Sequence, residues 1–252
     1  MVQQQSAKEG ARQAEPSAGG TAQPDGDAVA DPQEALFAAV TAPGPISCLA
    51  TMYAALKAGA SAEAVDECGR SALHIAAYEN EDAEAVAAVI PALVAEGADP
   101  QATSPDSEAT PLHVAACNEN AAAAAAAIES LVIAGADAKS RDSQGRQPIH
   151  WVCHNRSGPA AAAAVEVLLS AGCSASAQDN ADMQPLHCCA SSCETTAAAE
   201  AAVKALVAAG GSTRARCMKG GMPLHYCGQN RSTEGTPAAL LPSECSQLQT
   251  AT

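Results

Sequence analysis

Apolar residues recur at fixed distances before a series of glycines. Seven, four and three residues before Gly135 stand Ile128, Leu131 and Val132, and the same offsets are apolar before the next two glycines of the series. This spacing puts the apolar side chains on one stripe of a 3.6-residue period, so it predicts an amphipathic helix that ends at each glycine. Glycine suits that end because it adopts the left-handed C-cap conformation without strain. The closing glycines are Gly59, Gly97, Gly135, Gly172 and Gly210.

A second pattern, a histidine after an apolar residue, recurs every 37 to 39 residues. Four of the five histidines follow Pro-Leu or Pro-Ile, and proline suits the first position of a helix, where its missing N–H has no helical partner. Turn-forming segments such as Asp142-Ser143-Gln144-Gly145-Arg146 precede these short helices. A turn, a short helix and a longer helix repeated at this period predict a solenoid rather than one globular core. The histidines are His74, His113, His150, His187 and His225.

The segment Thr110-Pro111-Leu112-His113-Val114-Ala115-Ala116, closed by Gly135-Ala136-Asp137, resembles the ankyrin repeat. Residues 71–77 with 97–99 make a second such copy, and the resemblance covers residues 33–242. It implies a mostly α fold, an ankyrin-repeat solenoid of helix–loop–helix units with short β-hairpin loops, in which the histidines are structural and bond neighbouring loop backbone. The family period is about 33 residues. The longer period here predicts a second helix extended by one turn at its N-terminus, near Asp82, Pro159 and Thr196.

Composition divides the chain into three regions. Residues 1–32, rich in Gln, Gly, Ala, Pro and acidic side chains, are predicted to be a disordered leader, and residues 243–252 a flexible tail. The repeat array occupies residues 33–242. It is predicted to comprise an N-terminal cap (33–65), four repeats (66–104, 105–141, 142–178 and 179–216) and a C-terminal cap (217–242).

Acidic residues outnumber basic ones by 28 to 13, which gives a net charge of −15. This balance argues against nucleic acid or an anionic membrane as the main partner, because both require a basic surface. Residues 33–137 carry a net charge of −13, whereas residues 138–242 carry +2. The asymmetry favours a protein partner with a basic segment facing the acidic N-terminal half. The alternative is compositional drift on a solvated surface. The sequence leaves the oligomeric state open.

We expect a cytoplasmic or nuclear protein. The N-terminus has no apolar core typical of a signal peptide, and no apolar run is long enough for a transmembrane helix. The chain has 11 cysteines, an odd number, which favours free thiols in a reducing compartment.

Cysteine and histidine cluster on the predicted short helices, as Cys153 and His154 after His150 and as Cys188 and Cys189 after His187. Zinc prefers these ligands, and a cysteine beside a histidine can act as a nucleophile. However, Cys153 and Cys189 replace a small buried residue of the repeat, where a free cysteine behaves as a small hydrophobe. We therefore expect structural cysteines, no metal, no cofactor and no catalytic residue. We also expect Cys188 and Cys193 to be the more exposed thiols.

The turn tips and the exposed face of the short helices form the predicted working surface. The sequence predicts a non-catalytic scaffold that binds a protein partner on this concave face. The alternatives are a targeting or regulatory subunit of an enzyme complex and a thiol- or zinc-dependent sensor. One repeat position holds an asparagine three times, as Asn118, Asn155 and Asn230. These amides either form a row that contacts an extended partner, or they only end the short helix and start the loop. The predicted binding residues are Glu67, Arg70, Tyr78, Glu79, Gln144, Arg146, His154, Asn155, Met183, Lys219, Gln229 and Asn230.

Overall fold

The computed structural model describes residues 31–192 and 196–227. Over these residues the protein is mostly helical, as predicted, with eleven α-helices and one short 3-10 helix. The only β-pairing in the described ranges is an isolated bridge between Val65 and Ser71. The predicted leader up to residue 30, the tail and most of the C-terminal cap lie outside these ranges.

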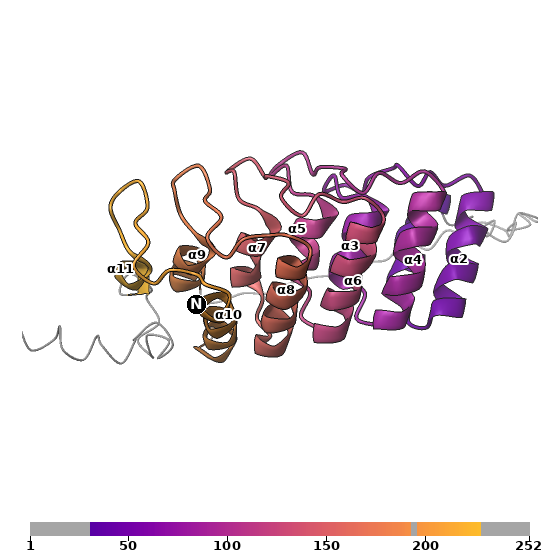
Figure 1. Cartoon of the computed structure of the whole chain (residues 1–252). Coiled ribbons are helices and arrows are strands. Elements are labelled where there is room, and N and C mark those ends of the chain that lie inside the picture. Colours follow the sequence, from indigo (N-terminus) through magenta and orange to yellow (C-terminus); the bar gives the residue numbers. More distant parts are fainter. Residues whose placement is uncertain (1–30, 193–195, 228–252) are drawn as a thin grey trace, which may run out of the picture. The chain divides into compact units, whose positions relative to one another are not determined.

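Five helices of 13 residues form an outer layer and pack side by side in chain order (Figure 1). Each is followed by a glycine with a positive φ, for example 100° at Gly135, as expected for a left-handed C-cap. At their N-termini, Asp82 and Asn120 accept hydrogen bonds from the first-turn N–H groups of α4 and α6. The outer helices are α2 (Pro45–Lys57), α4 (Ala83–Ala95), α6 (Ala121–Ile133), α8 (Gly158–Ser170) and α10 (Thr196–Ala208).

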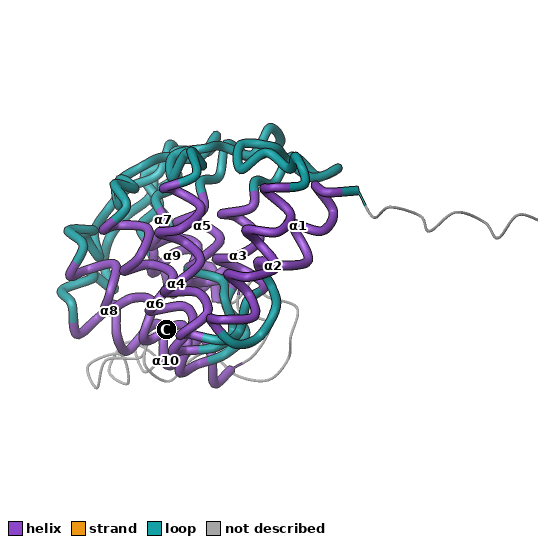
Figure 2. The backbone as a smooth tube through the Cα atoms, turned by 90° about the vertical axis from the view of Figure 1, so that its right-hand side faces the viewer, coloured by secondary structure: helices purple, strands orange, loops and turns teal. Residues whose placement is uncertain are grey.

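Shorter helices form an inner layer, and loops run along one edge of both layers (Figure 2). All but one begin with proline at the first helical position, where its missing N–H costs nothing. Among the described residues, no helix is long and apolar enough to cross a membrane. The inner helices are α1 (Pro32–Val40), α3 (Ala72–Glu79), α5 (Pro111–Ala115), α7 (Pro148–Trp151) with the 3-10 helix η1 (Val152–His154), α9 (Pro185–Ser192) and α11 (Pro223–Cys227).

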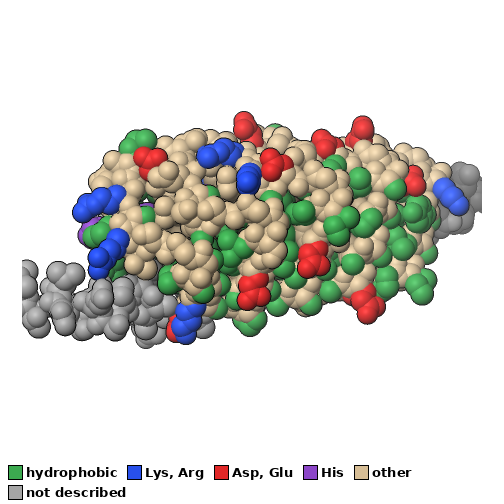
Figure 3. Space-filling model, in the orientation of Figure 1, with side chains coloured by type: hydrophobic (Ala, Val, Ile, Leu, Met, Phe, Trp, Pro, Cys, Tyr) green, Lys and Arg blue, Asp and Glu red, His purple; other side chains and the backbone are tan. Residues whose placement is uncertain are grey.

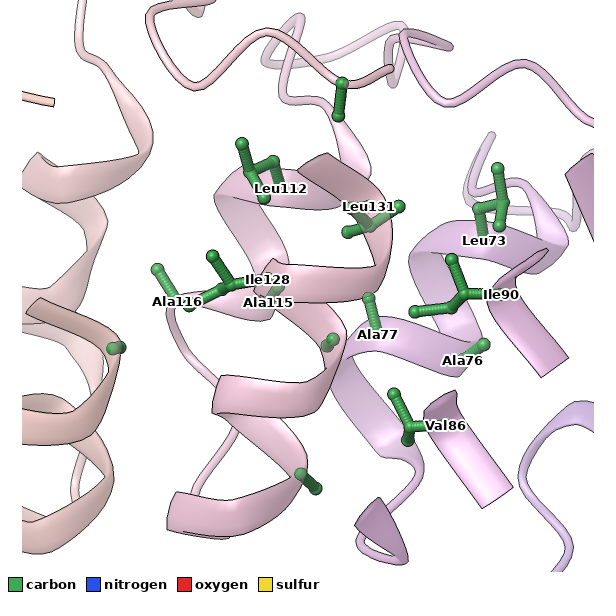
Figure 4. Packing of buried hydrophobic residues seen from close by; sticks show 14 of the residues in the cluster. Leu73, Ala76, Ala77, Val86, Ile90, Leu112, Ala115, Ala116, Ile128 and Leu131 are labelled. Carbon is green, nitrogen blue, oxygen red and sulfur yellow. The ribbon is translucent and has the colours of Figure 1, made fainter. Parts of the chain in front are cut away.

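The core between the layers is built from branched aliphatic side chains and alanines of both layers, with Leu73 and Leu112 of the inner helices as fully buried as Ile90 and Ile128 of the outer ones. Ile90 of α4 and Ile128 and Leu131 of α6 are fully buried, and they lie against the alanines of α3 and α5 in Figure 4. Burial of each such aliphatic side chain stabilises the fold by about 1.5–3 kcal/mol. The small inner residues let the layers approach closely, which explains a core with few aromatic residues.

A turn of constant geometry connects each outer helix to the next inner helix. In the third turn, the N–H of Asp142 donates to the carbonyl of Arg146 and the N–H of Gly145 donates to the carbonyl of Asp142. The same two bonds recur in the other turns, with one extra residue in the second. Neighbouring turns are also joined directly, for example by the N–H of Asn180 and the carbonyl of Gln144 at 3.1 Å. The turns are residues 65–71, 103–110, 141–147, 178–184 and 216–222.

Candidate functional site: the hairpin face

The hairpin face is defined here as the five turns together with the side chains that the inner helices expose beside them. The repeat histidines hold this face together. In each motif the N–H of the residue before the helix donates to Nδ1 of the histidine, for example Thr110 N to His113 Nδ1 at 3.1 Å. Because Nδ1 accepts, the ring proton lies on Nε2, which donates to a carbonyl of the following turn. These turn carbonyls are Ala109 (from His74, 2.9 Å), Arg146 (from His113, 3.0 Å), Met183 (from His150, 3.2 Å) and Gly221 (from His187, 3.2 Å). Nε2 of His150 also lies 3.1 Å from the carbonyl of Ala177, just before the fourth turn.

These imidazoles are buried and neutral. Burial lowers the pKa of His113 to about 4, and it also lowers the pKa values of His74, His150 and His187. His225 makes the same bond from Met222 N to Nδ1 at 2.9 Å but is exposed. Four buried imidazoles thus fix each turn to the next one along the array.

A second ladder is formed by asparagines, and it corrects the prediction for Asn155. This residue is only 5% exposed, and its Nδ2 donates to the carbonyls of Ala116 (3.2 Å) and Asn118 (2.8 Å). Asn118 bonds in the same way to carbonyls of Ala77 and Asn80. The amides therefore satisfy backbone carbonyls of the preceding repeat. Asn155 is not available to a partner.

The remaining predicted binding residues in the described ranges reach the surface. Three are half-buried, namely Arg70, Arg146 and Met183, and Gln229 and Asn230 lie outside the described residues. In Figure 3, basic side chains gather over the C-terminal repeats, while acidic ones extend over the N-terminal repeats. The exposed members are Glu67, Tyr78, Glu79, Gln144, His154 and Lys219.

Asp142 anchors the third turn. Its Oδ1 accepts from the N–H groups of Gln144 and Arg146, and its Oδ2 accepts from Arg146 Nε (2.7 Å) and Trp151 Nε1 (2.9 Å). Its side chain has no exposed surface. Burial alone would raise the pKa of Asp142, but the bonds from Trp151 and Arg146 outweigh it and hold the pKa below its usual value.

Trp151 is the functional candidate that the sequence reasoning missed. The guanidinium of Arg146 lies 5.0 Å from the centre of its ring, and the rings of His113 and His154 meet it edge-on at 5.6 and 6.0 Å. A signal was available, because this is the only tryptophan of the chain and it occupies the position that Ile75 and Val114 hold in earlier repeats.

The cysteines correct a further prediction. Cys188 is 7% exposed and therefore buried, whereas Cys68, on the first turn, is exposed. Cys153 and Cys189 are buried, and Cys193 lies outside the described residues. In the part of the chain that the structure describes, no group of three or more His, Cys, Asp or Glu side chains could hold a metal ion.

On the outer helices, away from the hairpin face, a groove of about 400 Å³ lies between α6 and α8. Glu129 and Glu166 flank it, and Ile133 at its edge is 85% exposed. None of the predicted binding residues lines it.

Comparison with known proteins adds no family to this geometry. Neither a scan of family models nor a search of curated proteins returns a match to the chain.

Proposed function

We propose that the chain is an ankyrin-type solenoid, and that it acts as a non-catalytic scaffold that binds a protein partner on the hairpin face. The observation that carries the proposal is the succession of five turns with the same pair of backbone bonds, the second turn being one residue longer. Backbone bonds join the last four turns to each other, and the imidazoles of the inner helices join all five. A surface fixed in this way loses little conformational entropy when it binds.

The variation of side chains on this constant frame supports a recognition role. The position four residues before each repeat histidine is Arg70, Ala109, Arg146, Met183 and Gly221 in turn. These differ in size, charge and polarity although their backbones make equivalent bonds. A fixed frame with variable side chains allows neighbouring repeats to contact different residues of one partner.

Charge sets the expected orientation of that partner. The net charge of −13 over residues 33–137 attracts a basic segment to the N-terminal repeats. The proposed partner therefore places Lys and Arg over the first turn and the adjoining end of α3, where Glu67 and Glu79 are exposed.

The test is quantitative capture from native lysate with the full chain and two triple-alanine variants. One variant replaces Glu67, Tyr78 and Lys219 on the hairpin face, and its matched control replaces three exposed residues of the outer helices, Glu96, Glu129 and Ile133. All six positions are exposed, so both variants should unfold at nearly the wild-type temperature.

We expect proteins that are enriched on the wild type and on the outer-helix variant but lost from the hairpin-face variant. Loss from the outer-helix variant alone would move the binding surface to the groove beside Ile133. Equal enrichment on all three chains would refute the proposal.

A further inference from the structure

The third turn holds an arginine whose hydrogen-bonding capacity is only partly used. Arg146 is oriented by its Nε bond to Asp142 and by the ring of Trp151. Within residues 31–192 and 196–227, its terminal nitrogens Nη1 and Nη2 have no hydrogen-bond partner. Its side chain is 19% exposed. Part of a fixed, charged donor edge therefore reaches the surface in the middle of the hairpin face.

The equivalent arginine of the first turn has a second acceptor, which the Nη1 and Nη2 groups of Arg146 lack among the described residues. Arg70 occupies the equivalent position and bonds Asp66 through Nε at 2.8 Å. Its Nη1 also donates to Oε1 of Glu79 at 2.7 Å. The second carboxylate comes from the end of the inner helix, where the third repeat has His154 and Asn155 instead. Arg70 is thus already occupied within the chain, whereas Arg146 is not.

The neighbours of Arg146 cannot supply the missing acceptor. Asp142 already receives four hydrogen bonds, two on each oxygen. A partner that covers Arg146 would strip water from Nη1 and Nη2, and donors left buried without acceptors weaken binding. A carboxylate offers two oxygens in the geometry that the guanidinium edge matches, and such charge-assisted pairs are stronger than bonds to neutral carbonyls.

We propose that Arg146 and Trp151 form the anchor of the hairpin face, and that this anchor takes an Asp or Glu side chain of an extended partner segment, with an adjacent apolar residue packed on the Trp151 ring. The inference rests on the proposed scaffold function and names the partner chemistry at its centre. The net charge of +2 over residues 138–242 favours an acidic segment there, in contrast to the basic segment expected over the N-terminal repeats.

The first experiment selects a random dodecapeptide display library on the full wild-type chain, on Arg146→Gln and on Arg70→Gln. Arg70→Gln is the matched control because it removes the equivalent arginine, whose partners lie within the chain. We expect Asp or Glu beside an apolar residue to be enriched on the wild type and on Arg70→Gln, and this enrichment to be absent on Arg146→Gln.

The second experiment measures the affinity of the best selected peptide, made without tryptophan, through the fluorescence of Trp151. Replacement of its acidic residue by the matching amide should weaken binding to the wild type about tenfold. The same replacement should change binding to Arg146→Lys less than about twofold, because lysine lacks the two-nitrogen edge that pairs with a carboxylate. Lysine keeps a positive charge beside Asp142. Arg146→Lys also guards against a glutamine variant that fails to fold.

Acidic enrichment that survives on Arg146→Gln, or enrichment of basic or neutral peptides alone, would overturn the anchor while leaving the scaffold function intact. The anchor would also be overturned if the wild-type chain enriched no peptide relative to an uncoated surface. The scaffold function is judged separately by the lysate capture with the hairpin-face and outer-helix variants.

Discussion

The first and third turns share one backbone and one Asp–Arg pair, but the surroundings of the pair differ. Asp66 is 16% exposed at its side chain, and Arg70 reaches past it to the exposed Glu79. Asp142 has no exposed side-chain surface, because the Trp151 ring covers the pair and donates to its carboxylate. The third repeat has a tryptophan where the first has Ile75.

The difference shows how one residue of an inner helix can change the role of a turn. In the first turn solvent screens the charges, so the pair contributes little. In the third turn the carboxylate of Asp142 is shielded from water and depends on Arg146 and Trp151 as its donors. The same Asp–Arg pair is therefore part of a surface network in one repeat and has a buried carboxylate in the other.

Removal of the carboxylates should separate the two turns most strongly. Asp142→Ala leaves Arg146, Trp151 and two backbone N–H groups without their acceptor, and we expect it to destabilise the protein by about 3–5 kcal/mol. Asp66→Ala removes an acceptor that solvent partly reaches and that pairs with an arginine 36% exposed, and it should cost about 1 kcal/mol. Urea unfolding followed by far-UV circular dichroism measures both. Equal losses of unfolding free energy in the two variants would mean that the contact with Trp151 does not distinguish the third turn from the first.

Acid should act on the third turn through His113, which bonds its Arg146 carbonyl. The pKa of His113 is about 4 in the folded protein, compared with 6.5 for the unperturbed group. The unfolded chain therefore binds this proton first. The contribution of His113 to the free energy of unfolding is therefore full above about pH 6.5 and decreases as the pH is lowered from 6.5 to 4. The total loss is about 3 kcal/mol, and His113 causes no further loss below pH 4.

The control for this pH effect is His113→Gln, which does not titrate. Urea unfolding at several pH values should give a loss between pH 6.5 and 4 that is smaller in the variant by about 3 kcal/mol, while the other buried histidines continue to contribute. Parallel pH profiles for the two proteins would show that His113 is protonated in the folded state and that its bond to the third turn is weaker than the geometry indicates.

Local sequence was enough to predict the helices. The closing glycines fix the ends of the outer helices, and the prolines fix the starts of the inner ones, because both act within one or two residues of the boundary. The sequence predicts starts of the extended outer helices near Asp82, Pro159 and Thr196, and α4, α8 and α10 begin at Ala83, Gly158 and Thr196.

The errors concern residues whose surroundings are set by contacts outside their own short helix. Asn155 follows a short helix and is polar, so the pattern indicated an exposed residue. Its amide is buried because it bonds carbonyls 37 and 39 residues earlier in the chain. Cys188 is likewise buried, at 7% exposed. The contact of Trp151 with Asp142 spans nine residues and depends on the fold of the intervening turn, which spacing alone does not define.

The fifth turn offers a variation on the third. Cys217 occupies the position of Asp142, and its Sγ lies 3.1 Å from the hydroxyl of Tyr226, which takes the place of Trp151. The Tyr226 bond, helped by the N–H groups of Lys219 and Gly221, lowers the pKa of the Cys217 thiol. A carboxylate accepts the same bonds more strongly. We expect Cys217→Asp to stabilise the protein by about 1 kcal/mol, measured by urea unfolding, with Cys217→Ala as the control that should not.

The smallest expected effect compares the third and fourth turns at their left-handed residue. The third turn has Gly145 there, with φ 74°, and the fourth has Asp182, with φ 57°. An L side chain in this region is strained, so Asp182→Gly should raise stability by about 0.5–1 kcal/mol in spite of the greater freedom of glycine in the unfolded chain. The reverse change, Gly145→Ala, should destabilise by more than this, because its Cβ would also meet the side chain of Asn180. Thermal unfolding of both variants tests the pair. A destabilising Asp182→Gly would show that the turn depends on the side chain of Asp182 more than on the conformation of its backbone.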